Sequence, residues 1–290
     1  MPDVDRFAQM CESVQVHLAR FCRGFCIVLV GALEPMLDLM GKTVLLTGAS
    51  KGIGAATARI LGEAGAHLIA HYGSDRQGVE EATRAIPQNR LHLVQGDLAV
   101  PGSTEEIWRD ALAWRGRVDV LVNNAGIFLN EGGIDDSDEE WERVWATTMQ
   151  VNVMAPAALL RRAVRHFRKE GGGTAITISS WNGQRGSTNP RTIAYAASKA
   201  AIRAAMQTIA RGYAKEKILA YVIAPGVVRT RLSEQSAATL GGEEAVTSTL
   251  AMGEWVPPEE IGYLVAFLAT GRVRHLTGAT LDFNGASYVR

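Results

Sequence analysis

A tyrosine and a lysine four positions apart are the residues of this sequence best suited to proton transfer. They lie in the segment Tyr195-Ala-Ala-Ser-Lys199, where helical spacing places both side chains on one face. A phenol has an ordinary pKa of about 10, but a nearby ammonium group favours the phenolate and lowers that pKa. The pair therefore predicts acid–base chemistry on a substrate oxygen. The alternative is an amphipathic helix that packs a tyrosine ring, because short motifs have many false matches.

Two further polar residues stand where they would assist this chemistry. Ser180 directly follows the apolar run Thr174–Ser179, and its hydroxyl would hydrogen-bond a substrate oxygen and steady its developing charge. Asn152 lies inside a long apolar stretch, where a buried amide is costly unless it is hydrogen-bonded. The structural alternatives are hydroxyls that satisfy backbone groups at a strand end and an amide that bonds a neighbouring backbone group.

A glycine-rich loop near residue 50 has the composition of a phosphate-binding turn. It reads Thr47-Gly-Ala-Ser-Lys-Gly-Ile-Gly54, between a strand-like run and an alanine-rich helical stretch. Glycine lets the backbone turn sharply and approach a ligand, and the following helix presents free N–H groups to a pyrophosphate. A tight turn with close helix–strand packing is the alternative, but the position between the first strand and a helix favours binding.

Short apolar runs and longer amphipathic stretches alternate from Gly41 onward. Consecutive Val, Ile and Leu residues are typical of parallel strands covered on both faces. The alternation predicts an α/β fold: one domain with a doubly wound parallel sheet of about seven strands and helices on both faces. Ligands of such sheets bind outside the carboxyl ends of the strands. The expected strands are Thr43–Thr47, His67–Tyr72, Leu91–Gln95, Val118–Val122, Thr174–Ser179, Leu219–Ile223 and Thr280–Phe283, and the expected helices cover 53–64, 76–85, 103–114, 139–169, 193–215 and 258–270.

The composition argues against several classes of protein. Lys+Arg and Asp+Glu are both 30, whereas a nucleic-acid binder that relies on phosphate contacts is expected to show a basic excess. The three cysteines, Cys11, Cys22 and Cys26, all precede the domain, which indicates a reducing cytoplasmic location and no thiol catalysis. His67 and His71 lie in a strand-like run and are not expected to share a metal, and no metal site is predicted.

Residues 1–40 differ from the rest of the chain and are interpreted as an extension outside the core. Their apolar run, Phe25–Leu33, is far shorter than the ~18–20 residues of a membrane span, and no convincing signal-peptide cleavage site follows it. An extra helix, or upstream sequence before a start at Met36 or Met40, explains them, and a membrane anchor is the alternative. The catalytic domain then covers 41–290, without membrane association.

The ordered motifs from Gly41 to about Tyr288 are similar to those of the short-chain dehydrogenase/reductase family. They are the glycine loop, Gly96-Asp97-Leu98, Asn123-Asn-Ala-Gly126, Asn152, Ser180, Tyr195 with Lys199, and Pro225-Gly226. The resemblance implies a Rossmann fold and hydride transfer between a nicotinamide cofactor and a carbonyl or secondary alcohol. It makes Tyr195 the general acid or base, assisted by Lys199 and Ser180, and Asn152 the holder of a water that relays protons to the lysine.

The resemblance also implies the cofactor contacts. NAD-preferring relatives carry an Asp at the end of the second strand, where this sequence has Tyr72. Lys51 stands where many NADP-using relatives place a basic residue, and Ser74 and Arg76 would complete a phosphate pocket, although Asp75 is close by. NADP(H) is therefore favoured, with NAD(H) as the alternative. The predicted cofactor residues are Gly48, Ser50, Lys51, Gly52, Ile53, Gly54, Tyr72, Ser74, Asp97, Leu98, Asn124, Ala125, Gly126, Tyr195, Lys199, Pro225, Gly226, Val228 and Thr230.

The substrate is predicted only as a small carbonyl or alcohol. Ser180, Trp181, Gln184 and Tyr195 are its predicted contacts, and the segment 227–256 would cover the site as a lid. A carbohydrate, a small ketone, a steroid-like alcohol or a 3-oxoacyl thioester all fit.

Two other functions stay open, and the resemblance also implies assembly. A 3-oxoacyl-[acyl-carrier-protein] reductase would need a basic docking patch, which the α-helical arginines Arg161, Arg162, Arg165 and Arg168 would supply. A cofactor-binding regulator without turnover would have no need of Ser180, Tyr195 and Lys199 together.

Relatives are commonly homotetramers, so a homotetramer or homodimer that uses the helices near 139–169 and 193–215 is expected.

Overall fold

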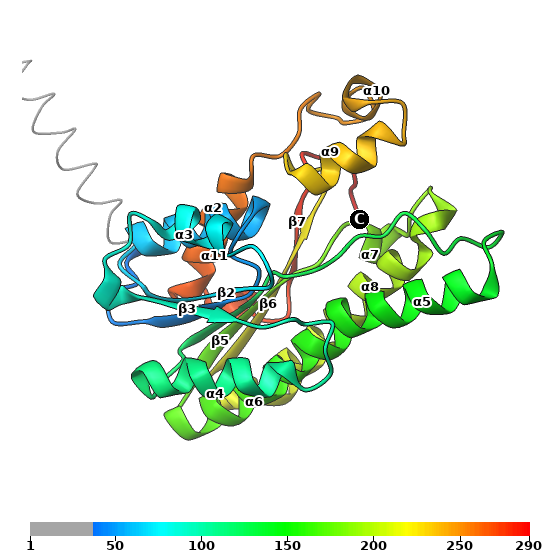
Figure 1. The fold of residues 1–290 in the computed structure, drawn as a ribbon. Helices are drawn as coiled ribbons and strands as arrows, with labels where there is room; N and C mark the ends of the chain where they lie inside the picture. Colours follow the sequence, from blue (N-terminus) through cyan, green and yellow to red (C-terminus); the bar gives the residue numbers. More distant parts are fainter. Residues whose placement is uncertain (1–36) are drawn as a thin grey trace, which may run out of the picture. The chain divides into compact units, whose positions relative to one another are not determined.

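Seven strands form one sheet in the part of the chain that the computed structural model describes, residues 37–290 (Figure 1). Their order is β3-β2-β1-β4-β5-β6-β7, and every neighbouring pair is parallel. The order reverses between β1 and β4, which is where such sheets bind their ligands. The predicted doubly wound sheet is confirmed. Its strands are β1 (Thr43–Leu46), β2 (His67–Tyr72), β3 (Leu91–Gln95), β4 (Val120–Asn123), β5 (Gly173–Ile178), β6 (Ile218–Pro225) and β7 (Thr280–Phe283).

Helices cover both faces of the sheet (Figure 1). One layer contains α4 (Ser103–Arg115), α5 (Asp138–Met149), α6 (Ala155–Glu170) and α8 (Ile193–Tyr213), and the other contains α2 (Gly52–Glu63), α3 (Arg76–Thr83) and α11 (Pro258–Ala269). Leu121, Leu159 and Met206 belong to the buried cluster between the sheet and the first layer. Because both faces of the sheet are covered, the central strands are apolar at consecutive positions rather than alternate ones.

Three regions differ from the sequence-based prediction. The single helix expected over 139–169 is divided by a π-helical turn, η3 (Gln150–Met154), in which the N–H of Ala155 bonds to the carbonyl of Gln150. Such wider turns accommodate an extra residue within a helix. Three short helices also occupy the segments predicted only as loop and lid: α7 (Asn182–Arg185), α9 (Arg231–Ala238) and α10 (Glu243–Thr247).

Residues 39–290 form one compact unit, to which the site described below belongs. The interpretations of Cys11, Cys22, Cys26 and the run Phe25–Leu33 fall outside the described residues. Across residues 37–290, no helix has the length and apolar character needed to cross a membrane.

Candidate active site

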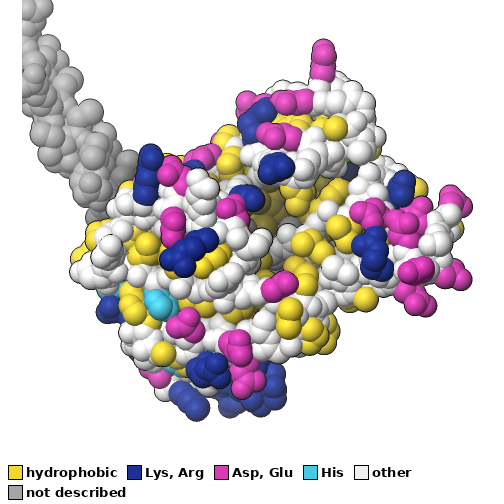
Figure 2. Space-filling view, viewed as in Figure 1, with side chains coloured by type: hydrophobic (Ala, Val, Ile, Leu, Met, Phe, Trp, Pro, Cys, Tyr) yellow, Lys and Arg dark blue, Asp and Glu magenta, His cyan; other side chains and the backbone are white. Residues whose placement is uncertain are grey.

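A cleft of about 1350 Å³ lies at the carboxyl ends of the strands. Its walls come from the segments that follow β1, β4, β5 and β6 and from the start of α9. Figure 2 shows the hollow, with hydrophobic side chains inside it. The sheet topology thus brings together loops that are up to about 180 residues apart in sequence. The predicted site residues that line the cleft are Gly48, Ser50, Lys51, Gly52, Ile53, Gly54, Asn124, Ala125, Gly126, Ser180, Tyr195, Lys199, Pro225, Gly226, Val228 and Thr230.

Tyr195 and Lys199 stand together on the first turns of α8, inside this cleft. The Nζ of Lys199 lies 5.7 Å from the Tyr195 ring centroid and donates a hydrogen bond of 3.0 Å to the carbonyl oxygen of Ile178. Burial lowers the pKa of Lys199 to about 8, because a charged ammonium loses its hydration there. Burial raises the pKa of the Tyr195 phenol, and a hydrogen bond with Ser180 opposes that rise. The expected net lowering of the phenol pKa beside the lysine is therefore not found, because burial raises this pKa.

The two serines after β5 have different partners. The hydroxyl of Ser179 donates to the backbone carbonyl of Lys199 over 2.8 Å and so joins β5 to α8. The Oγ of Ser180 accepts from the N–H of Asn182 over 3.1 Å, which leaves its own proton available to a ligand oxygen. Ser180 is thus the serine whose hydroxyl faces the phenol of Tyr195 in the cleft.

The π-helical turn η3 directs Asn152 toward the loop that follows β4. Its Oδ1 accepts from the N–H of Ile127 over 2.9 Å, and its Nδ2 donates to the carbonyl of Ile127 and to Ser198 Oγ over 3.0 and 3.1 Å. A Cβ placed on Gly126 would lie 3.2 Å from both Asn152 Oδ1 and Lys199 Nζ. The amide therefore supports the loop beside Lys199, and its oxygen retains one lone pair for a further donor.

The three glycines of the loop after β1 are required by close contacts. A Cβ on Gly54 would lie 1.9 Å from the carbonyl oxygen of Gly48, and Gly48 itself has φ +68°. A Cβ on Gly52 would meet Thr230 at 2.9 Å, so the loop and the segment after β6 nearly touch. Asn124 braces this arrangement, since its Nδ2 donates to the carbonyls of Thr47 and Gly48.

The predicted phosphate pocket at the end of β2 contains an ion pair. Lys51 Nζ lies 2.8 Å from Asp75, whose carboxylate also accepts from the N–H of Gly78 at the start of α3. Both contacts hold the pKa of Asp75 below its ordinary value, with the Lys51 hydrogen bond the larger cause. Arg76 pairs with Glu80. Of the described residues predicted to bind cofactor, Tyr72, Ser74, Asp97 and Leu98 are not among those that line the cleft.

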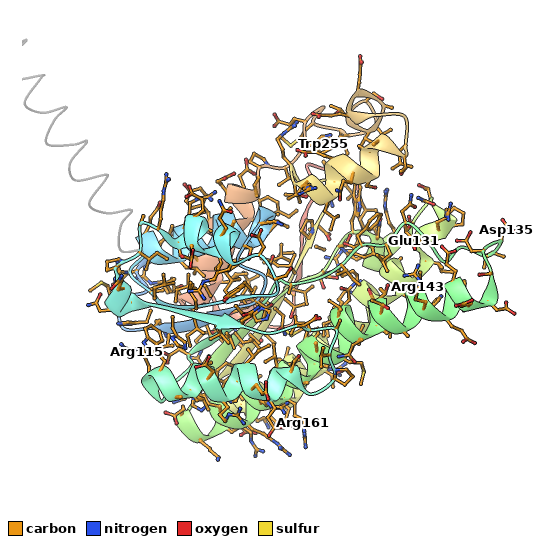
Figure 3. The ribbon with its side chains drawn as sticks, viewed as in Figure 1. Arg115, Glu131, Asp135, Arg143, Arg161 and Trp255 are labelled. Atoms are coloured by element: carbon orange, nitrogen blue, oxygen red, sulfur yellow. The ribbon has the colours of Figure 1, made fainter. Side chains whose placement is uncertain are left out.

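Two predicted substrate residues, Trp181 and Gln184, are not among those that line the cleft. Trp181 packs against the lid cluster of Ala237, Leu250 and Trp255, and the guanidinium of Arg185 lies 4.0 Å from the Trp181 ring centroid. Figure 3 shows Trp255 within the lid segment. Gln184 donates to Asp282 on β7. Leu232, from the predicted lid segment 227–256, does line the cleft, and Ile127, Phe128 and Leu129 line it without having been predicted.

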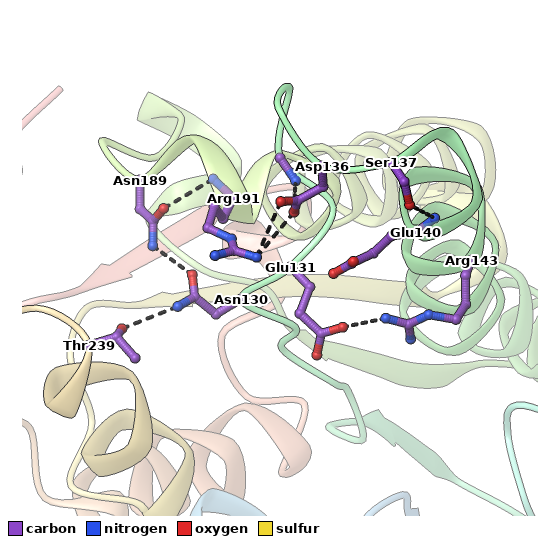
Figure 4. A network of polar contacts seen from close by, with 10 residues as sticks. Asn130, Glu131, Asp136, Ser137, Glu140, Arg143, Asn189, Arg191 and Thr239 are labelled. Atoms are coloured by element: carbon purple, nitrogen blue, oxygen red, sulfur yellow. Dashed lines mark hydrogen bonds and ion pairs between the residues drawn. The ribbon is translucent and has the colours of Figure 1, made fainter.

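A chain of polar contacts links three loops near the cleft (Figure 4). Asn130, after β4, accepts from Asn189 over 2.8 Å and donates to Thr239 at the end of the α9 segment over 3.2 Å. The neighbouring charges form pairs, Arg191 with Asp136 and Arg143 with Glu131. The segment after β6 is thereby hydrogen-bonded to the loop after β4, which is itself bonded to the loop before α8.

Comparison with known proteins finds a matching family model and similar oxidoreductases. Residues 48–285 match a family model described as enoyl-(acyl carrier protein) reductase. A 3β-hydroxysteroid dehydrogenase 1 from Eggerthella lenta is 35% identical over 86% of this chain and 94% of its own. A 3-oxoacyl-[acyl-carrier-protein] reductase from Rickettsia conorii is 32% identical over 86% of this chain and 98% of its own.

Two solved structures share the fold. A 3-oxoacyl (acyl-carrier-protein) reductase from Agrobacterium tumefaciens with NADP bound has a TM-score of 0.78 and 31% identity, covering 87% of this chain and 96% of that one. A 3-ketoacyl-(acyl-carrier-protein) reductase from Brucella melitensis complexed with NADH has a TM-score of 0.76 and 25% identity, covering 87% and 100%. One neighbour binds NADP and the other NADH.

Proposed function

Because this chain belongs to the short-chain dehydrogenase/reductase family, we propose that Tyr195 exchanges a proton with the oxygen of a carbonyl or secondary alcohol substrate. The chain is an NAD(P)-dependent oxidoreductase with 3-oxoacyl reductases among its relatives. The convergence of Tyr195, Ser180 and Lys199 in one cleft carries the assignment of the residues.

The residues along the cleft fit a nicotinamide dinucleotide. In the described chain, α2 begins at Gly52 without a side-chain cap and without an acidic residue in its first turn, so its free N–H groups suit an anionic pyrophosphate. The glycines leave room for close backbone approach where any Cβ would clash. When bound, the cofactor supplies the hydride.

The protein residues manage the proton and the substrate oxygen. The Ser180 hydroxyl donates to that oxygen and stabilises its negative charge, while the Tyr195 hydroxyl delivers its proton during reduction. Lys199 lies behind the phenol and stabilises the phenolate that remains, and Asn152 supports the lysine side of the site. In alcohol oxidation each proton moves in the opposite direction.

The Lys199 pKa of about 8 predicts the pH dependence of catalysis. Reduction consumes a proton, and the protonated lysine that supports its delivery is lost as the pH rises through that pKa. We expect kcat/KM for reduction to be constant below about pH 7 and to fall about tenfold per unit above about pH 8, with oxidation showing the opposite trend. Lys199→Arg, which stays charged, should move the fall to higher pH. An unchanged midpoint in that variant would contradict the assignment of this titration to Lys199.

We propose NADP(H) as the preferred cofactor, supported by Tyr72 in place of a carboxylate at the end of β2 and by Lys51 and Arg76 nearby. Lys51→Ala should raise the KM for NADPH about tenfold and leave that for NADH within about twofold, since the lost charge-assisted contact is to the 2′-phosphate. The steady-state parameters with both cofactors measure this. Asp75→Asn, which frees Lys51 from its ion pair, is the matched control and should lower the KM for NADPH further. If Lys51→Ala changed the KM values for NADPH and NADH equally, the proposed preference would be refuted.

The substrate half of the cleft supports a neutral and largely apolar carbonyl compound. Phe128 lies edge-on to Tyr195, with ring centroids 5.0 Å apart, and Leu129 and Leu232 also line the cleft. The charged side chains of Arg191 and Asp136, on loops near the cleft, are paired with each other. Apolar walls with few polar groups are typical of sites for small organic ligands.

A second candidate is reduction of a 3-oxoacyl carrier-protein thioester, which the relatives with this activity favour. The arginines expected to dock an acidic carrier protein give little support to this candidate. Two of them are already paired with carboxylates of this chain, Arg162 with Glu105 and Arg168 with Glu216. The helix α6 also leads away from Asn152, which places Arg168 about 24 Å farther along the helix axis. Figure 3 shows Arg161 and Trp255 on opposite sides of the molecule.

A substrate panel with NADPH distinguishes these functions. It contains a steroid-like ketone, a small ketone, an aldose and a 3-oxoacyl thioester, each followed by nicotinamide absorbance. Turnover of the apolar ketones supports our proposal, and a preference for the thioester supports the second candidate. Cofactor binding without turnover of any substrate would instead favour a regulatory protein.

We also propose a cytoplasmic homotetramer, on the pattern of the family. Met154 and Ile193 are apolar and 59% and 37% exposed, and they lie on the two long helical segments expected to pair. Light scattering of the purified full-length chain measures the assembly directly.

A further inference from the structure

His71 links the two loops that would hold opposite parts of the cofactor's adenosine half. It lies near the end of β2, between β1 and β3 in the sheet, and its side chain is 2% exposed. The N–H of Gly48, the first glycine of the phosphate loop, donates to His71 Nδ1 over 3.2 Å. On the other side, His71 Nε2 lies 2.9 Å from the carbonyl oxygen of Gly96.

These two contacts define the state of the ring. A backbone N–H can only donate, so Nδ1 must accept, and Nε2 must then carry the proton that bonds to Gly96. The imidazole is therefore neutral, with one specific tautomer. Burial lowers the pKa of His71, which agrees with this state.

The loops on either side of the ring depend on each other through it. Gly48 lines the cleft, and Gly96 directly precedes Asp97, which the family resemblance assigns to the adenine edge of the cofactor. The main chain of β2 contributes as well, because the carbonyl of His71 accepts from Ala49 and that of Tyr72 accepts from Gly96. The side chain of His71 thus adds a second connection between neighbouring strands at the place where both leave the sheet.

We propose that His71 is a positioning residue. It sets the separation between the phosphate loop, Thr47–Gly54, and the loop after β3, Gly96–Leu98, here called the adenine loop, and so determines the affinity for the adenosine half of the cofactor. The proposal rests on the proposed cofactor site. Removal of the ring leaves a buried N–H and a buried carbonyl unpaired, which lets both loops move.

The test measures binding of two cofactor fragments to the full chain. ADP is titrated by calorimetry and nicotinamide mononucleotide by saturation-transfer NMR, together with the melting temperature without ligand. We expect His71→Leu to weaken ADP binding about tenfold and to leave the mononucleotide unchanged. His71→Asn keeps an acceptor for Gly48 and His71→Gln keeps a donor for Gly96, so each should lose less affinity than Leu.

His67→Leu is the matched control. It makes the same replacement on the same strand, four residues earlier and about 13 Å farther from the cleft, and should leave ADP binding unchanged. Wild-type ADP affinity in His71→Leu, or an equal loss for both fragments, would overturn the proposal. If the leucine variant does not fold, the Asn and Gln variants decide, and wild-type ADP affinity in both would also overturn it. A wild-type chain that binds neither these fragments nor NADPH would refute the proposed function itself.

Discussion

Tyr195→Phe is expected to lower turnover about 10³-fold while the fold and the binding of cofactor stay intact. The substitution removes one oxygen atom, the proton donor, from a ring that otherwise keeps its packing against Phe128. The hydroxyl of Ser180 and the ammonium of Lys199 remain, so substrate and cofactor affinities should change little. Steady-state kinetics and the thermal shift caused by NADPH measure the two effects separately.

Tyr213→Phe is the control for this change. Tyr213 ends the same helix, α8, and its ring contacts the guanidinium of Arg168 rather than the cleft. It should retain wild-type activity. Near-normal turnover in Tyr195→Phe, with the variant correctly folded, would refute the proton-transfer role and with it the proposed mechanism.

Gly54→Ala is expected to have the second largest effect. Its new Cβ would lie 1.9 Å from the carbonyl oxygen of Gly48 and 2.6 Å from Asn124 Nδ2, so the loop must separate from α2. Overpacking of this kind costs about 1–3 kcal/mol of stability. A displacement of the helix N-terminus by about 1 Å also places the cofactor wrongly, with an expected loss of about 10² in kcat/KM.

Gly212→Ala is the matched substitution on α8. Nothing lies within 4 Å of the Cβ position at Gly212, and its φ is not in the positive region. There the added methyl group should stabilise the chain by about 0.5–1 kcal/mol, because alanine is the better helix former. Thermal unfolding of both variants, with and without NADPH, tests the contrast. Wild-type stability and NADPH binding in Gly54→Ala would show that the loop tolerates a side chain.

The features that depend on neighbouring residues are readable from the sequence. The period of apolar residues indicates the strands and helices, and their alternation predicts the parallel sheet, because a covered strand must be apolar on both faces. The spacing of Tyr195 and Lys199 on one helix face is also local, as is the need for glycine in the turn after β1. The boundaries of β2, β3 and β7 are as predicted, and those of the other strands shift by at most two residues.

The features that depend on which distant atoms meet are decided by the tertiary structure alone. Gln184 follows Ser180 closely in sequence. It nevertheless bonds Asp282, about a hundred residues away, because α7 turns it toward β7. Asn152 reaches Ile127 only through a π-helical turn that no local pattern indicates. In the sequence, His71 is an ordinary strand residue. Only the folded sheet places the loops after β1 and β3 on either side of its ring, where it contacts Gly48 and Gly96. Propensity and periodicity act over a few residues, whereas these contacts arise from the packing of whole helices and strands. The sequence therefore indicates the scaffold and the reaction class. The folded chain decides which contacts each side chain makes.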